Sequence, residues 1–507
     1  MILGETPTAA SSAATLDDLF RRAGVRHPDA LALADPPNRQ NFTDGIPRAL
    51  SFAQADRAIS AIAARLRGLG LQTDSAVAIQ LPNIVESIVA FLGVLRAGMI
   101  ALPLPLLWRQ EEIVSALRQV GVKAIIGCSR FGQTDQIEIA MQSAVELFSI
   151  RHVCGFGPNL PDGIVPLDGI FLREGAEATV SVPRLGPAAA HVAAITFYPD
   201  ASGLAPIARS HVELVAGGLE TFLESGAGTD TPTLSTIPIG SFAGMALTVI
   251  PWLLCGGALH LHHSFDPHAF DAQYRAVTDG TVILPAVAVA ALGECATFDH
   301  AGRTVVALWR APERVSGAKA WEGPSHLVDV TSFGETGLIA VRRDGGGLPA
   351  PIPLGPISSI HRAPGAPVVI ETSRTKAGTL ALRGRMVPGQ TFQAPHSASI
   401  GAYVDTGFAC SPARDPQTLV VTAPPSGTIS VGGYCFRQSQ IEAAVAQADQ
   451  KATIVALPDA DLGQRLAGTA ADREALQSGL QARGANPLLS GAFEPRHRPK
   501  LPDFVRR

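Results

Sequence analysis

The amino-acid sequence predicts an α/β protein with a large N-terminal domain of parallel-type sheets, a small barrel-like subdomain and a small α+β C-terminal domain. Strands and helices alternate from 51 to 127, short apolar runs separated by Gly and Pro follow from 338 to 382, and a Pro-rich stretch lies at 422–427. The 507 residues exceed the roughly 250–300 that one hydrophobic core organises. More than one domain is therefore expected.

The N-terminal part has the clearest periodicity. Residues 51–68 place apolar side chains at helical spacing, and Gly68-Leu69-Gly70 ends this element. The pattern then predicts a strand at 76–81, a helix at 84–97, a strand at 100–104, a helix at 113–120 and a strand at 123–127. Such alternation indicates βαβ units and a parallel sheet covered on both faces, and it returns from 193 to 310.

Three later segments complete the predicted organisation. Residues 338–382 favour an antiparallel, barrel-like subdomain. The stretch 422–427 is typical of a hinge, which divides the chain into residues 1–423 and 424–507, the second with a βαβ-like pattern. Residues 242–261 contain no Asp, Glu, Lys or Arg, but Pro251 and Gly256-Gly257 interrupt them. We expect a buried core element there and not a transmembrane helix.

Composition and short sequence patterns argue against nucleic-acid binding, secretion and a metal site. Forty Lys and Arg against 44 Asp and Glu, without a basic run, argue against nucleic acid as a partner. The N-terminus lacks the pattern of a secretory signal, so a cytoplasmic location is expected. The six cysteines form no CxxC pair, and the adjacent His262 and His263 would point opposite ways in an extended chain, so no metal site is predicted.

A series of different short motifs follows one after another along roughly 400 residues. They include Leu50-Ser51-Phe52, Gln80-Leu81-Pro82-Asn83, Phe265-Asp266-Pro267, Arg310-Ala311-Pro312, Phe333-Gly334-Glu335-Thr336 and Val431-Gly432-Gly433-Tyr434. Their order and spacing resemble the adenylate-forming (AMP-binding) superfamily of acyl-CoA and aryl-CoA synthetases. The resemblance implies that the small C-terminal domain is mobile and that a nucleotide site lies between it and the N-terminal domain. It also implies that ATP and a carboxylic acid give an acyl-adenylate and pyrophosphate, after which a thiol, usually that of CoA, displaces AMP.

The resemblance also implies roles for individual residues. It places Thr336 and Glu335 in the catalytic motif and assigns an acyl pocket to Ser241, Phe242 and Gly244. The loop of Gly432, Gly433 and Tyr434 would contact CoA and close the two domains. The nucleotide-binding positions would be Ser202, Gly203, Ala311, Pro312, Phe333, Gly334 and Asp405.

Several positions depart from the family pattern. In the phosphate loop, Pro199 removes a backbone donor, Asp200 adds a negative charge and the usual Lys is absent, so the loop is interpreted as a strand-to-helix turn kept for folding. The magnesium-binding Glu position holds Gly337, and the ribose-binding Asp position holds Phe408. The C-terminal catalytic Lys position holds Val505.

Three functions remain open from the sequence. The first is an acyl-CoA or aryl-CoA synthetase-like protein with impaired ATP-dependent acid activation that binds an acyl or aryl ligand. The second is an active acid:CoA ligase with a remodelled site, and the third is a non-catalytic subunit of an active homologue. No cofactor is expected to be bound permanently, and ATP, Mg and CoA are expected only for the ligase. The expected partners are a small carboxylic acid or its thioester and other subunits of a homo- or hetero-oligomer.

Overall fold

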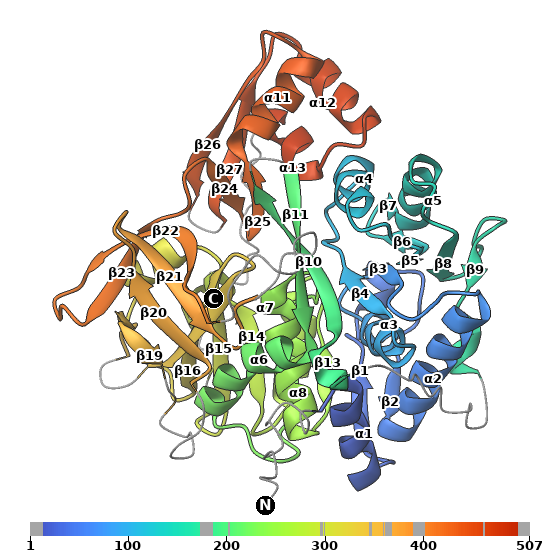
Figure 1. Cartoon of the computed structure of the whole chain (residues 1–507), viewed down its shortest axis with the longest axis horizontal. Coiled ribbons are helices and arrows are strands. Elements are labelled where there is room, and N and C mark those ends of the chain that lie inside the picture. The colour runs from blue at the N-terminus through green and yellow to red at the C-terminus, as the bar shows by residue number, and fades with distance from the viewer. Residues whose placement is uncertain are drawn as a thin grey trace, which may run out of the picture.

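The structure is a computed structural model that describes residues 14–172, 186–200, 203–294, 298, 300–343, 347–357, 359, 368–388, 401–459 and 462–494. Within them the chain forms two large α/β sheets, a six-stranded antiparallel sheet and a small four-stranded C-terminal domain. In Figure 1 the C-terminal elements lie at the top of the view, above the two large sheets.

The first large sheet has seven strands, which are parallel except for the hairpin of β10 and β11. Across the sheet they are β11 (Gly203–Ser210), β10 (Val192–Asp200), β4 (Ile100–Pro103), β3 (Ala76–Gln80), β5 (Ala124–Cys128), β8 (His152–Phe156) and β9 (Val165–Pro166). The connecting helices are α2 (Phe52–Gly68), α3 (Val85–Arg96), α4 (Gln110–Arg118) and α5 (Gln136–Glu146), and β6 (Arg130–Phe131) pairs with β7 (Thr134–Asp135).

The βαβ pattern predicted from 51 to 127 is confirmed, with one change at its fourth helix. Helix α4 begins at Gln110, three residues earlier than predicted, so the polar stretch before it is its first turn. The Glu112 side chain accepts a hydrogen bond of 2.9 Å from the Arg109 backbone N–H, which satisfies a donor that the helix start leaves unpaired.

The second large sheet has eight strands and is parallel except at its two edges. Its strands are β17 (Gly337–Arg342), β16 (His326–Phe333), β15 (Thr304–Trp309), β14 (Thr281–Pro285), β12 (Thr233–Ser235), β13 (Leu259–Leu261), β1 (Leu31–Ala34) and β2 (Ala49–Ser51). The associated helices are α1 (Leu16–Arg26), α6 (His211–Ser225), α9 (Pro267–Ala276) and α10 (Ala286–Glu294).

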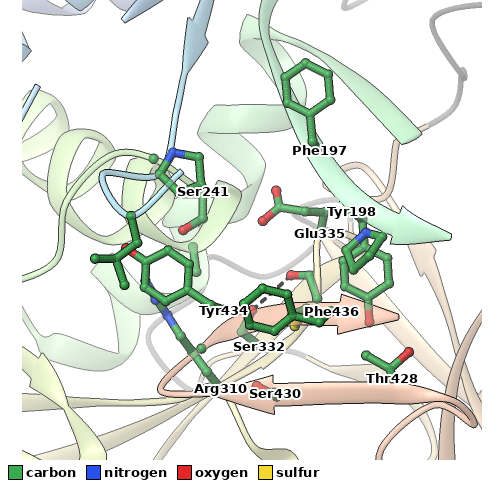
Figure 2. Close-up of a pocket in the computed structure, with 18 of the residues that line it drawn as sticks. Phe197, Tyr198, Ser241, Arg310, Ser332, Glu335, Thr428, Ser430, Tyr434 and Phe436 are labelled. Carbon is green, nitrogen blue, oxygen red and sulfur yellow. Dashed lines mark hydrogen bonds between the residues drawn. The ribbon is translucent and has the colours of Figure 1, made fainter. Parts of the chain in front are cut away.

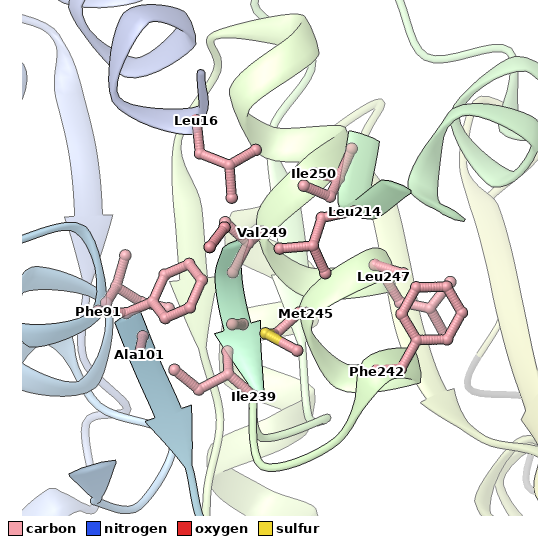
Figure 3. Close-up of a cluster of buried hydrophobic side chains, with 14 of the residues drawn as sticks. Leu16, Phe91, Ala101, Leu214, Ile239, Phe242, Met245, Leu247, Val249 and Ile250 are labelled. Atoms are coloured by element: carbon pink, nitrogen blue, oxygen red, sulfur yellow. The ribbon is translucent and has the colours of Figure 1, made fainter. Parts of the chain in front are cut away.

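The uncharged segment 242–261 lies in the core, as predicted (Figure 3). It forms α7 (Phe242–Gly244), the π-helical turn η5 (Met245–Val249), α8 (Ile250–Cys255) and strand β13. Helix α6 packs closely against it, since a Cβ on Gly218 would lie 2.4 Å from the Cβ of Ile250. Among the residues that the structure describes, no helix is long and apolar enough to cross a membrane.

The antiparallel subdomain is present, but its bounds differ from the predicted 338–382. Strand β17 belongs to the second large sheet, because it pairs along its whole length with β16. The six-stranded sheet consists of β18 (Ile352–Pro353), β23 (Thr418–Ala423), β22 (Val404–Pro412), β21 (Thr379–Gly384), β20 (Ile370–Arg374) and β19 (Gly355–Ile357). Only Leu354 separates its edge strands β18 and β19 along the chain, so the sheet curls into a barrel-like shape.

The C-terminal part has a core of its own, formed by twelve buried side chains between Ile429 and Phe493. Its strands are β25 (Tyr434–Arg437), β24 (Thr428–Val431), β27 (Gly463–Thr469) and β26 (Thr453–Asp459), and its helices are α11 (Gln438–Ala448), α12 (Arg473–Ala482) and α13 (Pro487–Ser490). The βαβ-like prediction is wrong, because every pairing in this sheet is antiparallel and three residues separate β26 from β27. The domain boundary after residue 423 stays a prediction.

A buried carboxyl group lies where the C-terminal domain meets α4. Asn486, which caps α13, faces the Glu112 carboxyl group, and a Cβ on Gly484 would lie 3.2 Å from the Gln110 Cβ. Burial raises the pKa of Glu112 to about 7, and the hydrogen bonds from Arg109 and Asn486 oppose this shift only in part. Glu112 therefore holds its proton in the folded protein at a pH where an exposed Glu has lost it.

Replacing Glu112 with Gln is expected to flatten the pH dependence of stability. The folded state binds more protons than the unfolded state between about pH 4.5 and 7, so the stability contributed by protonated Glu112 is present below pH 4.5 and is lost as the pH rises through 7. From pH 5 to 8 the unfolding free energy of the wild type should fall by about 1–3 kcal/mol relative to Glu112→Gln. Urea unfolding at several pH values measures this difference. Glu111→Gln, an exposed neighbour, should behave like the wild type, and parallel curves for Glu112→Gln and wild type would contradict the assignment.

Candidate functional site

A cavity of about 350 Å³ lies where the two large sheets and the C-terminal domain meet (Figure 2). The second large sheet contributes residues that follow the carboxyl ends of its parallel strands, and the first sheet contributes residues that follow β4 and β5 and residues of the β10–β11 hairpin. Ligands of open α/β sheets bind at this edge of the strands. The lining residues include Leu104, Trp108, Phe131, Phe197, Tyr198, Ser241, His263, Arg310, Gly334, Glu335, Phe408, Tyr434 and Phe436.

The stretch expected to hold phosphates is an antiparallel hairpin, so the interpretation as a strand-to-helix turn is wrong. The β10–β11 ladder runs from Val192 opposite Ser210 to Asp200 opposite Gly203. Many of its backbone N–H groups therefore bond to the neighbouring strand and are unavailable to a ligand. At its end, the Asp200 carboxylate accepts a hydrogen bond of 3.0 Å from the Gly203 backbone. Gly203 does not line the cavity, and Ser202 lies outside the described residues.

Gly334, a predicted nucleotide-binding residue, meets an aromatic side chain from the β10–β11 hairpin. A Cβ on Gly334 would lie 2.5 Å from a ring carbon of Tyr198, so only glycine allows this contact. Burial raises the pKa of Tyr198, which also forms a hydrogen bond with Thr428 of the C-terminal domain. Phe333 is buried, does not line the cavity and packs against Phe408, with 5.5 Å between the ring centroids. Tyr198 thus occupies the space beside Gly334.

The Glu335 carboxylate is held inside the protein. It accepts a hydrogen bond of 2.9 Å from the backbone N–H of Phe242, and it lies 3.9 Å from the Arg209 guanidinium. Arg209 also donates to the Glu335 carbonyl and lies 3.9 Å above the Phe242 ring. Burial raises the pKa of Glu335 and lowers that of Arg209 to about 10, and the attraction between the two charges opposes both shifts. The contacts between Arg209 and Glu335 thus connect β11 to the turn between β16 and β17.

Three further positions of the predicted site, Gly337, Thr336 and Asp405, do not line the cavity. A Cβ on Gly337 would lie 3.1 Å from Leu382 in the core of the barrel-like subdomain. Thr336 belongs to the tight turn after β16, where its N–H donates to Phe333, and it does not line the cavity. Exposed Asp405 accepts hydrogen bonds from Thr379 and Gly407.

The predicted acyl-pocket residues share one turn, but only Ser241 lines the cavity. Its hydroxyl oxygen caps α7 by accepting a hydrogen bond of 3.1 Å from the Gly244 N–H. A Cβ on Gly244 would lie 2.0 Å from the Pro238 carbonyl oxygen, which explains the glycine. Phe242 is fully buried beneath Arg209. Of the positions after β15, Ala311 lines the cavity and Pro312 is buried beside it.

The predicted closure loop is the β24–β25 hairpin, which forms one wall of the cavity. Gly432 and Gly433 have φ angles of 57° and 92°, and a Cβ on Gly433 would lie 2.2 Å from the Arg310 side chain. Burial raises the pKa of the Tyr434 phenol, while a hydrogen bond from the Leu107 backbone and the positive charge of Arg310 oppose the shift. Figure 2 shows Tyr434, Phe436 and Thr428 of this wall together with Phe197, Tyr198 and Glu335 of the N-terminal domain.

The sequence interpretation missed the aromatic walls of the cavity. Trp108 and Phe197 lie 5.7 Å apart between ring centroids, and Phe131 lies 5.1 Å from His263. The available signal was the position of Trp108 and Phe131, which follow the buried strands β4 and β5 of the first sheet; Phe197 lies within β10 and had no such signal. His262 and His263 do point to different surroundings, and the described residues contain no group of three or more His, Cys, Asp or Glu that could hold a metal ion. Val505 and neighbouring Lys500 lie outside the described residues.

Comparison with known proteins agrees with this architecture. Residues 20–154 match the family model described as "AMP-binding enzyme". The chain is 27% identical to the 2-hydroxy-7-methoxy-5-methyl-1-naphthoate–CoA ligase of Streptomyces carzinostaticus over 88% of this chain and 81% of that protein. It is 33% identical to a long-chain-fatty-acid–CoA ligase of Salmonella typhimurium, over 27% of this chain and 22% of that one. The amide bond synthetase McbA of Marinactinospora thermotolerans shares the fold, with a TM-score of 0.69, 18% identity and coverage of 93% of this chain and 94% of that one.

Proposed function

Because the chain belongs to the adenylate-forming superfamily of AMP-binding enzymes, we propose that it binds a compact aryl carboxylic acid or its thioester and is impaired in ATP-dependent acid activation. One observation carries this proposal. Tyr198 lies against Gly334 and Phe408 stands at the ribose position, so the protein's own side chains take these nucleotide positions, while the rings of Trp108, Phe131 and Phe197 line the same cavity.

The described residues do not fit MgATP. A triphosphate needs free backbone donors and a metal ligand, but the β10–β11 ladder uses donors of this stretch and Asp200 adds a negative charge. The magnesium position, Gly337, points into an apolar core, and the nearby Glu335 is bonded to Phe242 and close to Arg209. Loss of one preorganised transition-state donor costs about 2.7–4 kcal/mol, and several are altered at once.

The size and the aromatic lining of the cavity favour a flat, compact ligand. A volume of about 350 Å³ lies at the small end of the roughly 300–1,000 Å³ that is usual for small-molecule sites. Aromatic walls offer large contact areas to a ring at little cost in conformational entropy. The relative from Streptomyces, which this chain matches over 81% of that protein's length, is named as a ligase for a substituted naphthoate, and this supports an aryl class for this chain as well.

A calorimetric titration with two probes tests the proposal. The wild-type chain should bind 2-naphthoic acid with a measurable dissociation constant, whereas MgATP should give no binding and no acid-dependent pyrophosphate exchange. Ser241→Trp, which fills the cavity, should abolish binding of the acid because Ser241 lines it. Ser115→Trp, the same exchange at an exposed serine, should leave binding unchanged. Absence of 2-naphthoic acid binding to the wild type would contradict the proposal.

The second candidate, an active acid:CoA ligase with a remodelled site, is favoured by one observation. Glu335 lies two residues before the family's magnesium position, yet it lines the cavity. A micromolar dissociation constant for MgATP, together with acid-dependent pyrophosphate exchange, would establish the ligase and contradict impaired activation. In that case Glu335→Gln should abolish the exchange.

A further inference from the structure

The two adjacent histidines after β13 have different roles. The imidazole of His262 is fully buried, with Nδ1 at 2.7 Å from the Gln273 side-chain oxygen and Nε2 accepting from the backbone N–H of Asp266. Both of its ring nitrogens are therefore used within the protein. His263 instead lines the cavity, although burial of its ring is extensive.

The surroundings of His263 define its chemical state. Its Nδ1 accepts a hydrogen bond of 3.4 Å from the Asn83 backbone N–H, so the neutral ring carries its hydrogen on Nε2. The rings of Phe131 and Phe42 lie at centroid distances of 5.1 and 5.7 Å. Burial, and to a lesser degree nearby His262, lowers the pKa of His263 to about 4. The imidazole is therefore neutral at neutral pH and keeps one N–H donor.

The described lining of the cavity carries one basic side chain, besides the carboxyl groups of Glu313 and Glu335. Arg310 is the one Lys or Arg among the described lining residues, and it lies against the β24–β25 hairpin. A carboxylate or thioester carbonyl is best placed near this guanidinium, because a charged donor stabilises a negative or polarised oxygen more than a neutral one does. His263 lines the same cavity and packs against Phe131 and Phe42, so it offers the ring of an aryl ligand a neutral donor among aromatic side chains.

We propose that His263 is a specificity-determining residue whose Nε2–H donates a hydrogen bond to an oxygen substituent on the ring of the aryl ligand. The inference rests on the proposed function and narrows its substrate class to hydroxylated or alkoxylated aryl acids or their thioesters. A buried donor that loses its water without gaining an acceptor is costly, so an unsubstituted ring binds less well.

Matched probes test the inference on the full chain. Calorimetry at pH 7.5 compares 2-naphthoic acid with 6-hydroxy-2-naphthoic acid for the wild type, His263→Phe and His263→Gln. The wild type should prefer the hydroxylated probe by about 2- to 10-fold, the size of one hydrogen bond. His263→Phe should lose the preference, and His263→Gln, which retains an N–H donor, should keep part of it. Exposed His268→Phe is the control and should keep all of it.

Each result has a defined meaning. Equal affinities of the wild type for both probes, or a preference that persists in His263→Phe, would overturn the role of His263 and leave aryl binding intact. If neither probe binds the wild type, the proposed function fails and the inference fails with it. If His263→Phe does not fold, the comparison of wild type with His263→Gln decides, supplemented by ¹⁵N NMR of the His263 ring. A hydroxylated probe should shift the Nε2 resonance, and an unchanged Nε2 resonance would contradict the contact.

Discussion

Replacing Arg209 with Met is expected to lower the free energy of unfolding by about 3–5 kcal/mol at neutral pH. Arg209 is 1% exposed and Glu335 is 8% exposed, so removing the guanidinium leaves a buried carboxylate without its counter-charge. The substitution also removes the hydrogen bond to the Glu335 carbonyl and the contact with the Phe242 ring. The loss should shrink as the pH falls toward 4, because Glu335 can then become neutral.

Urea unfolding followed by tryptophan fluorescence measures this effect. All four tryptophans, at 108, 252, 309 and 321, precede the predicted domain boundary, so the signal reports on the N-terminal part. The double variant Arg209→Met/Glu335→Gln should recover much of the loss, since it removes both charges. Arg275→Met, at an exposed ion pair with Asp271, should change stability by less than about 1 kcal/mol. A similarly small loss for Arg209→Met would refute the importance of the buried pair.

Introducing the family's magnesium ligand by Gly337→Glu is expected to destabilise the protein by more than about 3 kcal/mol and to confer no affinity for MgATP. An added Cβ lies 3.1 Å from Leu382, 3.6 Å from the Met386 sulfur and 3.7 Å from Ile370, and these three side chains are fully buried. A carboxylate that continues in this direction enters an apolar core with no cation beside it among these contacts.

Gly337→Ala separates the effect of charge from that of size. It adds only the Cβ, so the neighbouring side chains have to move by a few tenths of an ångström and the expected loss is about 1 kcal/mol. Urea unfolding and a MgATP titration of the three proteins give both quantities. A Gly337→Glu protein that is as stable as the wild type and binds MgATP would mean that this position reaches the cavity after all.

Elements specified by local patterns were predictable from the sequence. Helix α2 and strands β3, β4 and β5 agree with their predicted ranges within one or two residues, because each buries a face that its own apolar spacing defines. The strand pairing of the C-terminal domain was not predictable in this way, because the order of β25, helix α11 and β26 along the chain is typical of a parallel crossover. The pairing is decided instead by contacts between strands distant in sequence, such as Val431 with Gly463.

The candidate site was predictable in its location more than in its contacts. Glu335, Ser241 and Gly433, which the family resemblance assigned to the site, line the cavity, and their roles stay predictions. The partner of Glu335 could not be foreseen, because Arg209 lies 126 residues away and reaches it only through the packing of α6 and the large sheets. The side chain of Tyr198 beside Gly334 depends in the same way on the hairpin register.

The cavity wall contributed by β24 and β25 links ligand binding to the arrangement of the two parts of the chain. Thr428, Gly433 and Tyr434 come from one part, and Trp108 and Arg310 from the other, so a molecule that fills the cavity contacts both. Ligand binding therefore stabilises the arrangement in which the two parts are in contact. At a ligand concentration 100-fold above the dissociation constant, this stabilisation is about 2.7 kcal/mol. The fraction of molecules with a filled cavity and the fraction with the two parts in contact therefore rise and fall together.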